Sequence, residues 1–178
     1  AASVLDESKS ASCIISVTAL NRELKGVIWD EEGQVWWSKF NTDTLPAYER
    51  LSAVDLPVNA TMVAGDTLYA STLDTANMVS DLYTVDPVTY EMTLVGPSEI
   101  GYTDMTNAPS LGCGIATYGQ YIVLVDLQTG DYMGAWDWTE GAAGDLVGIT
   151  YYGSAFNSNY NAYMDYYYLI DNKGNLYA

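Results

Sequence analysis

The strongest constraint on the fold of this chain is a repeated hydrophobic run that ends in asparagine or aspartate. The four terminal residues, Asn41, Asp86, Asp126 and Asp171, lie 45, 40 and 45 positions apart. Proline, threonine or glycine follows each of them within four positions. Asp and Asn accept hydrogen bonds from the backbone of a turn, Pro presets φ, and Gly accepts a positive φ. Each repeat is therefore predicted to contain a β-hairpin at this turn.

Further runs with β-strand composition flank each turn. They are rich in Val, Ile, Thr, Tyr and Trp, which suit half-buried strands. Long stretches of the residues that favour helices are absent from the sequence. The sequence therefore predicts an all-β fold. The predicted strands around the turns lie near 26–29, 48–54, 61–65, 91–95, 114–119, 132–138, 146–153 and 175–178.

A repeat of 40–45 residues that holds several short strands is typical of a β-propeller. We expect one β-propeller-like domain at 21–178, with 1–20 as a lead-in segment or first strand. Four units could form a closed four-bladed ring, an open arc completed by another copy, or part of a longer propeller. We expect the last of these, a piece of a larger protein. The alternative is a β-sandwich with evenly spaced strands. The units are expected near 21–56, 57–101, 102–141 and 142–178.

The second repeat resembles the blade hairpin of secreted bacterial β-propellers. Leu82–Thr89 and Thr93–Gly96 follow that family's pattern of Leu-Tyr, an apolar residue, Asp-Pro and Thr, then a strand that ends in Gly. Tyr90 stands where the family has Gly, and Leu127 replaces the proline in the third unit. The resemblance covers about residues 20–178. It implies blade architecture but no particular activity, because propellers carry many functions.

The charge of the chain is acidic and unevenly distributed. The sequence has 6 Lys and Arg against 23 Asp and Glu, which gives a net charge of −17. No Lys or Arg occurs between Leu51 and Asn172. Proteins bind nucleic acids and anionic membranes largely through Lys and Arg, which neutralise the phosphates. Since most of this chain has neither residue, neither kind of partner is expected. No apolar run approaches the roughly 20 residues of a membrane helix, so no membrane insertion is expected.

The chain has no histidine and two cysteines. This composition excludes a Ser-His-Asp triad, a cysteine–histidine dyad, a histidine-ligated zinc site and a four-cysteine zinc site. Cys13 and Cys113 lie 100 positions apart. One interpretation is a disulfide that closes a long loop, and the other is two buried thiols.

Two stretches of oxygen-bearing side chains are candidate calcium sites. We expect either no cofactor or calcium. The first is an acidic turn that ends at Gly33, for which the simpler interpretation is a solvated hairpin turn. The second matches places 1, 3, 5 and 9 of an EF-hand loop, and the alternative is a polar loop between strands. The candidate ligands are Asp30, Glu31, Glu32, Asn157, Asn159, Asn161 and Asp165.

Tyrosines concentrate in the last repeat unit. Tyr has a large apolar face and a polar tip, which suit the binding of sugars or peptides. Because side chains alternate along a strand, Tyr167 is expected to point away from the face of Tyr166 and Tyr168. One face is then core, and the other meets solvent or a partner. The candidate binding residues are Tyr151, Tyr152, Tyr160, Tyr163, Tyr166 and Tyr168.

These features predict a non-catalytic interaction or scaffold domain of a larger bacterial protein, located outside the cell or at its surface. Few lysines, acidity and abundant Tyr, Asn, Thr and Gly favour that location. The expected partner is a carbohydrate or a protein, or else another copy or the rest of the parent chain, which would complete the propeller. The alternatives are a carboxylate-dependent glycoside hydrolase or lyase and a purely structural spacer. No acid pair is singled out by its context, so no catalytic residue is predicted.

Overall fold

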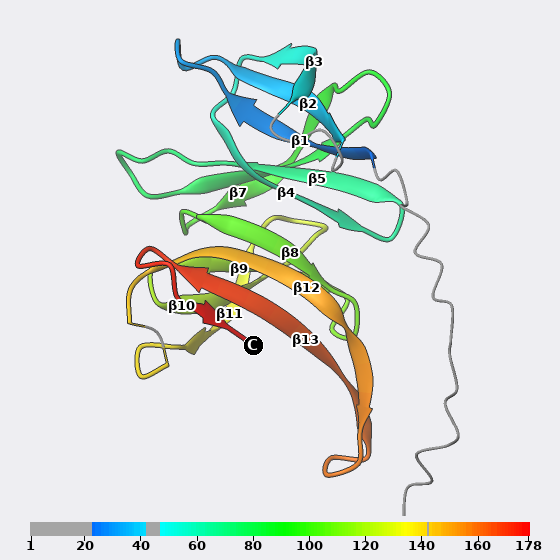
Figure 1. Cartoon of the computed structure of the whole chain (residues 1–178), viewed down its shortest axis with the longest axis vertical. Helices are drawn as coiled ribbons and strands as arrows, with labels where there is room; N and C mark the ends of the chain where they lie inside the picture. The colour runs from blue at the N-terminus through cyan, green and yellow to red at the C-terminus, as the bar shows by residue number, and fades with distance from the viewer. Residues whose placement is uncertain (1–22, 42–46, 142) are drawn as a thin grey trace, which may run out of the picture.

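The computed structural model describes residues 23–41, 47–141 and 143–178. The described residues form fourteen β-strands and no helix, which confirms the all-β prediction. The strands make four antiparallel sheets, and in each sheet neighbouring strands follow one another along the chain (Figure 1). The predicted lead-in at 1–20 lies outside the described residues.

The four sheets follow the order of the sequence. Sheet 1 contains β1 (Glu23–Trp29), β2 (Val35–Asn41) and β3 (Tyr48–Val54). Sheet 2 contains β4 (Val58–Ala64), β5 (Thr67–Thr72), β6 (Ser80–Val85) and β7 (Met92–Ser98). Sheet 3 contains β8 (Asp104–Ala108), β9 (Cys113–Tyr118), β10 (Tyr121–Val125) and β11 (Tyr132–Asp137). Sheet 4 contains β12 (Leu146–Asn157), β13 (Ala162–Asp171) and β14 (Leu176–Tyr177).

The predicted hairpins are present in all four sheets, as the pairs β2–β3, β6–β7, β10–β11 and β13–β14. The aspartates close three of these turns as their residue type predicts. The Asp86 carboxylate accepts hydrogen bonds from the backbone N–H groups of Val88 and Thr89, at 2.7 and 2.8 Å. Tyr90, in place of the family's glycine, adopts a left-handed φ of 62°. Tyrosine rarely adopts this backbone conformation. Here the Tyr90 ring stacks on Trp37 with the centroids 5.8 Å apart, and this contact favours the conformation.

Three hydrophobic clusters lie between sheets that follow one another in the chain. One joins sheets 1 and 2 around Trp37 and Val58. A second joins sheets 2 and 3 around Leu82 and Val123. The third joins sheets 3 and 4 around Ile115 and Leu169. No cluster of the described residues joins sheets 1 and 4, so a closed ring is not shown, and packed antiparallel sheets fit the sandwich alternative as well.

Sheet 4 contacts the sheet before it through the face that is opposite to the one used by sheets 2 and 3. In β6 and β10 the residue just before the turn aspartate, Val85 or Val125, packs against the preceding sheet. In β13 the corresponding residue is Ile170, which is exposed. Its neighbour Leu169 is buried against sheet 3 instead. Since side chains alternate along a strand, sheet 4 is turned over relative to the pattern of the earlier sheets.

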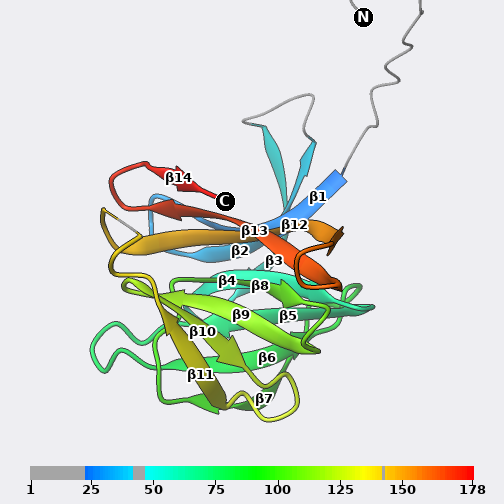
Figure 2. The same cartoon turned by 90° about the horizontal axis from the view of Figure 1, so that it is seen from below.

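Polar contacts from sheet 3 hold the turned sheet along the free edge of β12. The Asp104 carboxylate accepts a hydrogen bond from the Ile149 N–H at 2.8 Å. The Thr106 hydroxyl accepts one from the Tyr151 N–H at 3.1 Å. These side chains satisfy backbone donors that have no strand partner on that side. In Figure 2, β12 and β13 (orange and red) run alongside the green strands of sheet 3.

No helix in the part of the chain that the structure describes has the length and apolar character needed to cross a membrane.

Candidate functional site

The β12–β13 hairpin is the main candidate for a binding surface. Its two strands have 12 and 10 residues, against five to seven in the strands of the first three sheets. The tip of the hairpin extends past the other sheets in Figure 1. In β12 the register shifts between Tyr151 and Gly153, so Tyr152 is a bulged residue without a direct partner on β13. Such a bulge redirects side chains at the point where the hairpin leaves the core.

The tyrosines predicted to bind a partner fall into three groups. Tyr152, Tyr166 and Tyr168 lie on the outer face of sheet 4, away from sheet 3, and Tyr152 is 69% exposed. Tyr160 lies in the turn at the tip. Tyr163 lies on the inner face of the hairpin beyond sheet 3 and is 71% exposed. The predicted set is thus not one surface.

Tyr151 is the sixth predicted residue, and it turns towards sheet 3. Its ring lies 5.8 Å from that of Tyr167, which packs against the cluster between sheets 3 and 4. The bulge at Tyr152 explains why two consecutive tyrosines serve opposite faces. Tyr151 therefore supports the hairpin from its inner side.

The tyrosines of the outer face are held in a defined arrangement. The rings of Tyr152 and Tyr168 meet edge to face, with centroids 5.1 Å apart. Such pairs add roughly 0.5–1.5 kcal/mol beyond area burial, which favours a preorganised surface. Sequence reasoning overlooked Met164 and Ile170, which lie on this face two positions before Tyr166 and two positions after Tyr168 and are exposed. The period-2 pattern that grouped Tyr166 with Tyr168 would have found them.

A polar network fastens the inner face of the hairpin to the loop after β8. The Asp165 carboxylate accepts hydrogen bonds from the Ser110 N–H at 3.0 Å and from the Ser110 hydroxyl at 2.6 Å. The hydroxyls of Ser154 and Tyr167 also donate to it. Burial acts to raise the pKa of Asp165, but the hydrogen bonds from Ser110 and Ser154 outweigh it and lower that pKa. Burial and the nearby Asp165 raise the pKa of the Tyr167 phenol.

The first calcium candidate is a hairpin turn between β1 and β2. Asp30 accepts hydrogen bonds from the N–H groups of Glu32 and Gln34 and from the Trp36 indole, at 3.1, 2.9 and 2.9 Å. The indole hydrogen bond is the largest of the effects that lower the pKa of Asp30. Its carboxylate also lies 3.5 Å from the Arg50 guanidinium. Protein donors therefore already occupy this carboxylate.

The second calcium candidate is divided between a turn and a strand. Asn157 ends β12 and its side chain accepts a hydrogen bond from the Asn159 N–H at 3.0 Å. Asn161 has a left-handed φ of 49°, a backbone conformation that asparagine tolerates in turns. Asp165 lies three positions into β13, where it binds Ser110. Among the described residues, no group of three or more His, Cys, Asp or Glu side chains could hold a metal ion.

Cys113 is buried in β9, in the cluster between sheets 3 and 4. Burial raises the pKa of its thiol, so the thiol is unsuited to nucleophilic chemistry. Cys13 lies outside the described residues. The disulfide between them stays a prediction.

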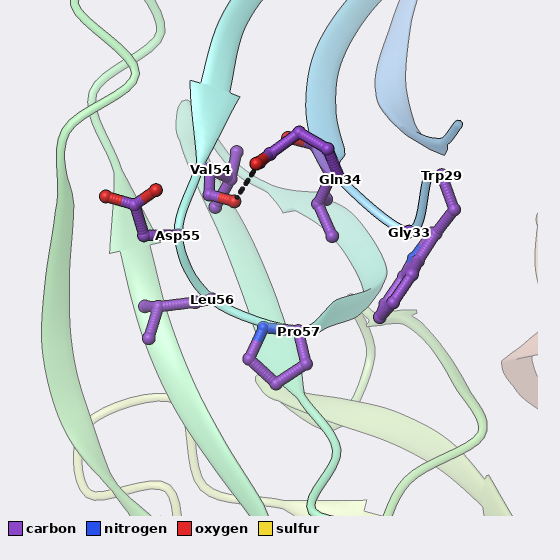
Figure 3. Close-up of a pocket in the computed structure, with 8 residues that line it drawn as sticks. Trp29, Gly33, Gln34, Val54, Asp55, Leu56 and Pro57 are labelled. Carbon is purple, nitrogen blue, oxygen red and sulfur yellow. Dashed lines mark hydrogen bonds between the residues drawn. The ribbon is translucent and has the colours of Figure 1, made fainter. Parts of the chain in front are cut away.

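A hollow of about 310 Å³ lies at the seam of sheets 1 and 2, between the β1–β2 turn and the β3–β4 connection (Figure 3). Trp29 forms one wall, and its indole donates to the Val58 carbonyl at 3.1 Å. Gln34 donates to the Val54 carbonyl at 2.8 Å, as the dashed line in Figure 3 shows. Asp55 is the single carboxylate that lines it. Glycosidic chemistry requires two carboxylates across a cleft, so this hollow does not support it.

A second hollow, of about 270 Å³, opens on the outer face of sheet 4. Tyr168, Ile170 and Leu176 form its apolar walls, and Asp104 of β8 reaches it beside the β12 edge. Burial raises the pKa of Asp104, although hydrogen bonds from the Ile149 and Met105 N–H groups oppose this rise. Sequence reasoning overlooked Asp104, since nothing local signals that it faces a strand 45 positions further on.

The chain matches no protein-family model and no curated protein. The resemblance to secreted bacterial β-propellers therefore stays a prediction.

Proposed function

We propose that this chain is a non-catalytic interaction domain whose partner binds the outer face of sheet 4. The observation that carries this proposal is the exposed apolar face formed by Tyr152, Tyr166 and Tyr168 with Met164 and Ile170. Isolated apolar side chains are normal at a protein surface, but a contiguous group of large ones is typical of an interaction site. Tyrosine is also among the residues enriched in protein interfaces.

The proposal includes a propeller-like array as the scaffold. The regular order of four antiparallel sheets supports it, and so does the equivalent packing of Val85 and Val125 against the preceding sheet. The turned sheet 4 then ends the regular array within this chain. A propeller completed by another copy, or by the rest of a larger bacterial protein, is the alternative in which a further blade rather than a separate partner covers the outer face of sheet 4. The location outside the cell or at its surface belongs to the same proposal, supported by the acidic, lysine-poor composition.

The experiment compares binding to glycan and peptide arrays for the full chain and two variants. The first variant carries Tyr152→Ser, Tyr166→Ser and Tyr168→Ser. The matched control carries Tyr121→Ser and Tyr132→Ser, which alter exposed tyrosines of sheet 3. We expect a ligand that the wild type and the control retain and the first variant loses. No ligand in either array, or equal loss in both variants, would contradict the proposal and leave the structural-spacer interpretation.

Calcium binding stays a separate proposal for the oxygen-rich turns. A ligand that binds only the folded state raises the unfolding midpoint by mass action. Thermal unfolding in calcium and in chelator measures this directly. Calcium binding at the second turn would be supported if calcium raises the unfolding midpoint of the wild type and of Asn59→Ala but not that of Asn157→Ala. An unchanged midpoint would exclude a structural calcium ion.

A further inference from the structure

The hollow on the outer face of sheet 4 has the size and lining of a site for one side chain. Its volume of about 270 Å³ lies below the range of roughly 300–1,000 Å³ typical of small-molecule pockets. Tyr168 offers a ring, while Ile170 and Leu176 offer aliphatic surface. Gly148 also lines it, where the lack of a side chain keeps the space open. A long side chain with an apolar stem fits such walls.

The chemistry of the hollow favours a cation. Asp104 is a half-buried carboxylate that lines it, and burial raises its pKa. Each Asp104 oxygen accepts one backbone hydrogen bond, from Met105 at 2.9 Å and from Ile149 at 2.8 Å. Among the described ion pairs none involves Asp104, so an arriving cation would supply the missing opposite charge. The chain has no Lys or Arg from Leu51 to Asn172. Lys173, the next cation, already donates to the Ala143 carbonyl.

Sheet 1 shows how this chain combines the same groups with a cation of its own. The Arg50 guanidinium lies 4.9 Å from the centroid of the Trp36 ring. It also lies 3.5 Å from the Asp30 carboxylate. One guanidinium therefore serves an aromatic ring and a carboxylate together. The hollow of sheet 4 contains the ring and the carboxylate without the guanidinium.

We propose that the outer face of sheet 4 docks an arginine-bearing segment of a partner protein, with one arginine side chain in the hollow between Tyr168, Ile170 and Asp104. This rests on the proposed function and adds the chemistry of the partner. Arginine fits better than lysine because its planar guanidinium stacks on rings and binds a carboxylate with two donors. The net charge of −17 on each chain disfavours a second copy as the occupant.

The test titrates the full chain with a short synthetic peptide in which arginine and leucine alternate. Matched peptides carry lysine or citrulline at the arginine positions, since citrulline keeps the shape and removes the charge. Isothermal titration calorimetry measures the affinity at low and high salt. We expect the arginine peptide to bind most tightly, the citrulline peptide not to bind, and salt to weaken the interaction.

Variants locate the binding site. Tyr168→Leu keeps an apolar side chain but removes the ring, and a cation–π contact of the usual strength predicts a loss of affinity of about five-fold. Tyr168→Phe should keep the affinity, and Ile170→Lys should abolish binding by placing a cation at the hollow. Tyr132→Leu makes the same change on sheet 3 and should have no effect. Circular dichroism confirms that each variant is folded.

Three results would overturn the inference. The first is that the arginine and citrulline peptides bind equally well. The second is that Tyr168→Leu and Ile170→Lys keep the wild-type affinity. The third is that Tyr132→Leu loses as much affinity as Tyr168→Leu. If the arrays yield a glycan that needs the outer-face tyrosines and the arginine peptide does not bind, this inference fails and the proposed function survives. If neither ligand binds, both fail.

Discussion

Sheets 1 and 4 stand at the two ends of the array and differ in what covers their aromatic rings. Sheet 1 supplies its own cations, because Arg50 lies over Trp36 and Lys25 lies over the Tyr90 ring at 5.5 Å. Sheet 4 has more exposed rings and no such cation among its described contacts. Cations of the chain therefore cover two half-buried rings at the first end, where Trp29 and Tyr48 stay exposed, whereas no described cation covers a ring of sheet 4. The difference shows that the aromatic content of this chain combines rings covered from within the chain with rings left at the surface.

The largest expected difference concerns stability. Trp37 of sheet 1 is 1% exposed, and Trp37→Ala should lower the free energy of unfolding by about 3–5 kcal/mol. Tyr168 of sheet 4 is exposed, and Tyr168→Ala should cost about 1 kcal/mol or less. Urea unfolding measures both. Similar costs for the two variants would mean that the outer face of sheet 4 is structural and would break the comparison.

Acid should unfold the protein partly through its turn aspartates at both ends. Burial opposes ionisation of Asp171, but hydrogen bonds from Asn175, Tyr177 and Lys173 lower its pKa to about 2. The pKa of an unfolded aspartate is about 3.9. The stabilisation from Asp171 is therefore fully present above about pH 4 and is lost as the pH falls towards 2.

The corresponding measurement is the unfolding midpoint between pH 6 and pH 2. Asp171→Asn should lower the midpoint at pH 6, and this deficit should shrink as the pH falls. Asp30→Asn should behave alike in sheet 1, because the Trp36 hydrogen bond lowers the pKa of Asp30. Asp55→Asn is the exposed control. A deficit that stays constant with pH would show that these carboxylates do not act through their charge.

The smallest expected effect comes from removing the cation of sheet 1. Arg50→Leu removes the ring contact and the ion pair with Asp30, and so makes this end resemble sheet 4. The Arg50 side chain is 44% exposed, and contacts of such a solvated cation contribute little, so the unfolding midpoint should fall by less than about 4 °C. Differential scanning calorimetry measures the shift. A much larger fall would show that Arg50 supports the fold rather than covering a ring.

Local features of the sequence predicted the hairpins, because an aspartate and its turn residues act within a few positions. The strand β8 was not predicted, since Asp104 and Asn107 are poor strand formers. Its formation depends on tertiary packing: Met105 is buried against sheet 2, and Ala108 is buried against sheet 4. Such contacts leave no trace in a local pattern.

The orientation of sheet 4 also could not be predicted from the sequence. Alternation separates Tyr167 and Leu169 from Tyr168 and Ile170, but both sets are apolar. A pattern of this kind defines two faces without indicating which one is buried. The binding tyrosines were therefore predicted as one set, whereas the structure divides them between the faces and the tip.

The most direct test of the account is the facing of β13, measured by thiol alkylation. Ile170→Cys and Leu169→Cys each place a thiol on one face, and maleimide labelling of the native protein follows its accessibility, with the wild-type chain as background. Because Ile170 is 41% exposed and Leu169 is 5% exposed, we predict rapid labelling at position 170 and protection at position 169. Protection at 170 with rapid labelling at 169 would show that sheet 4 packs like the sheets before it. The outer aromatic face would then be core, and the proposed docking site would not exist.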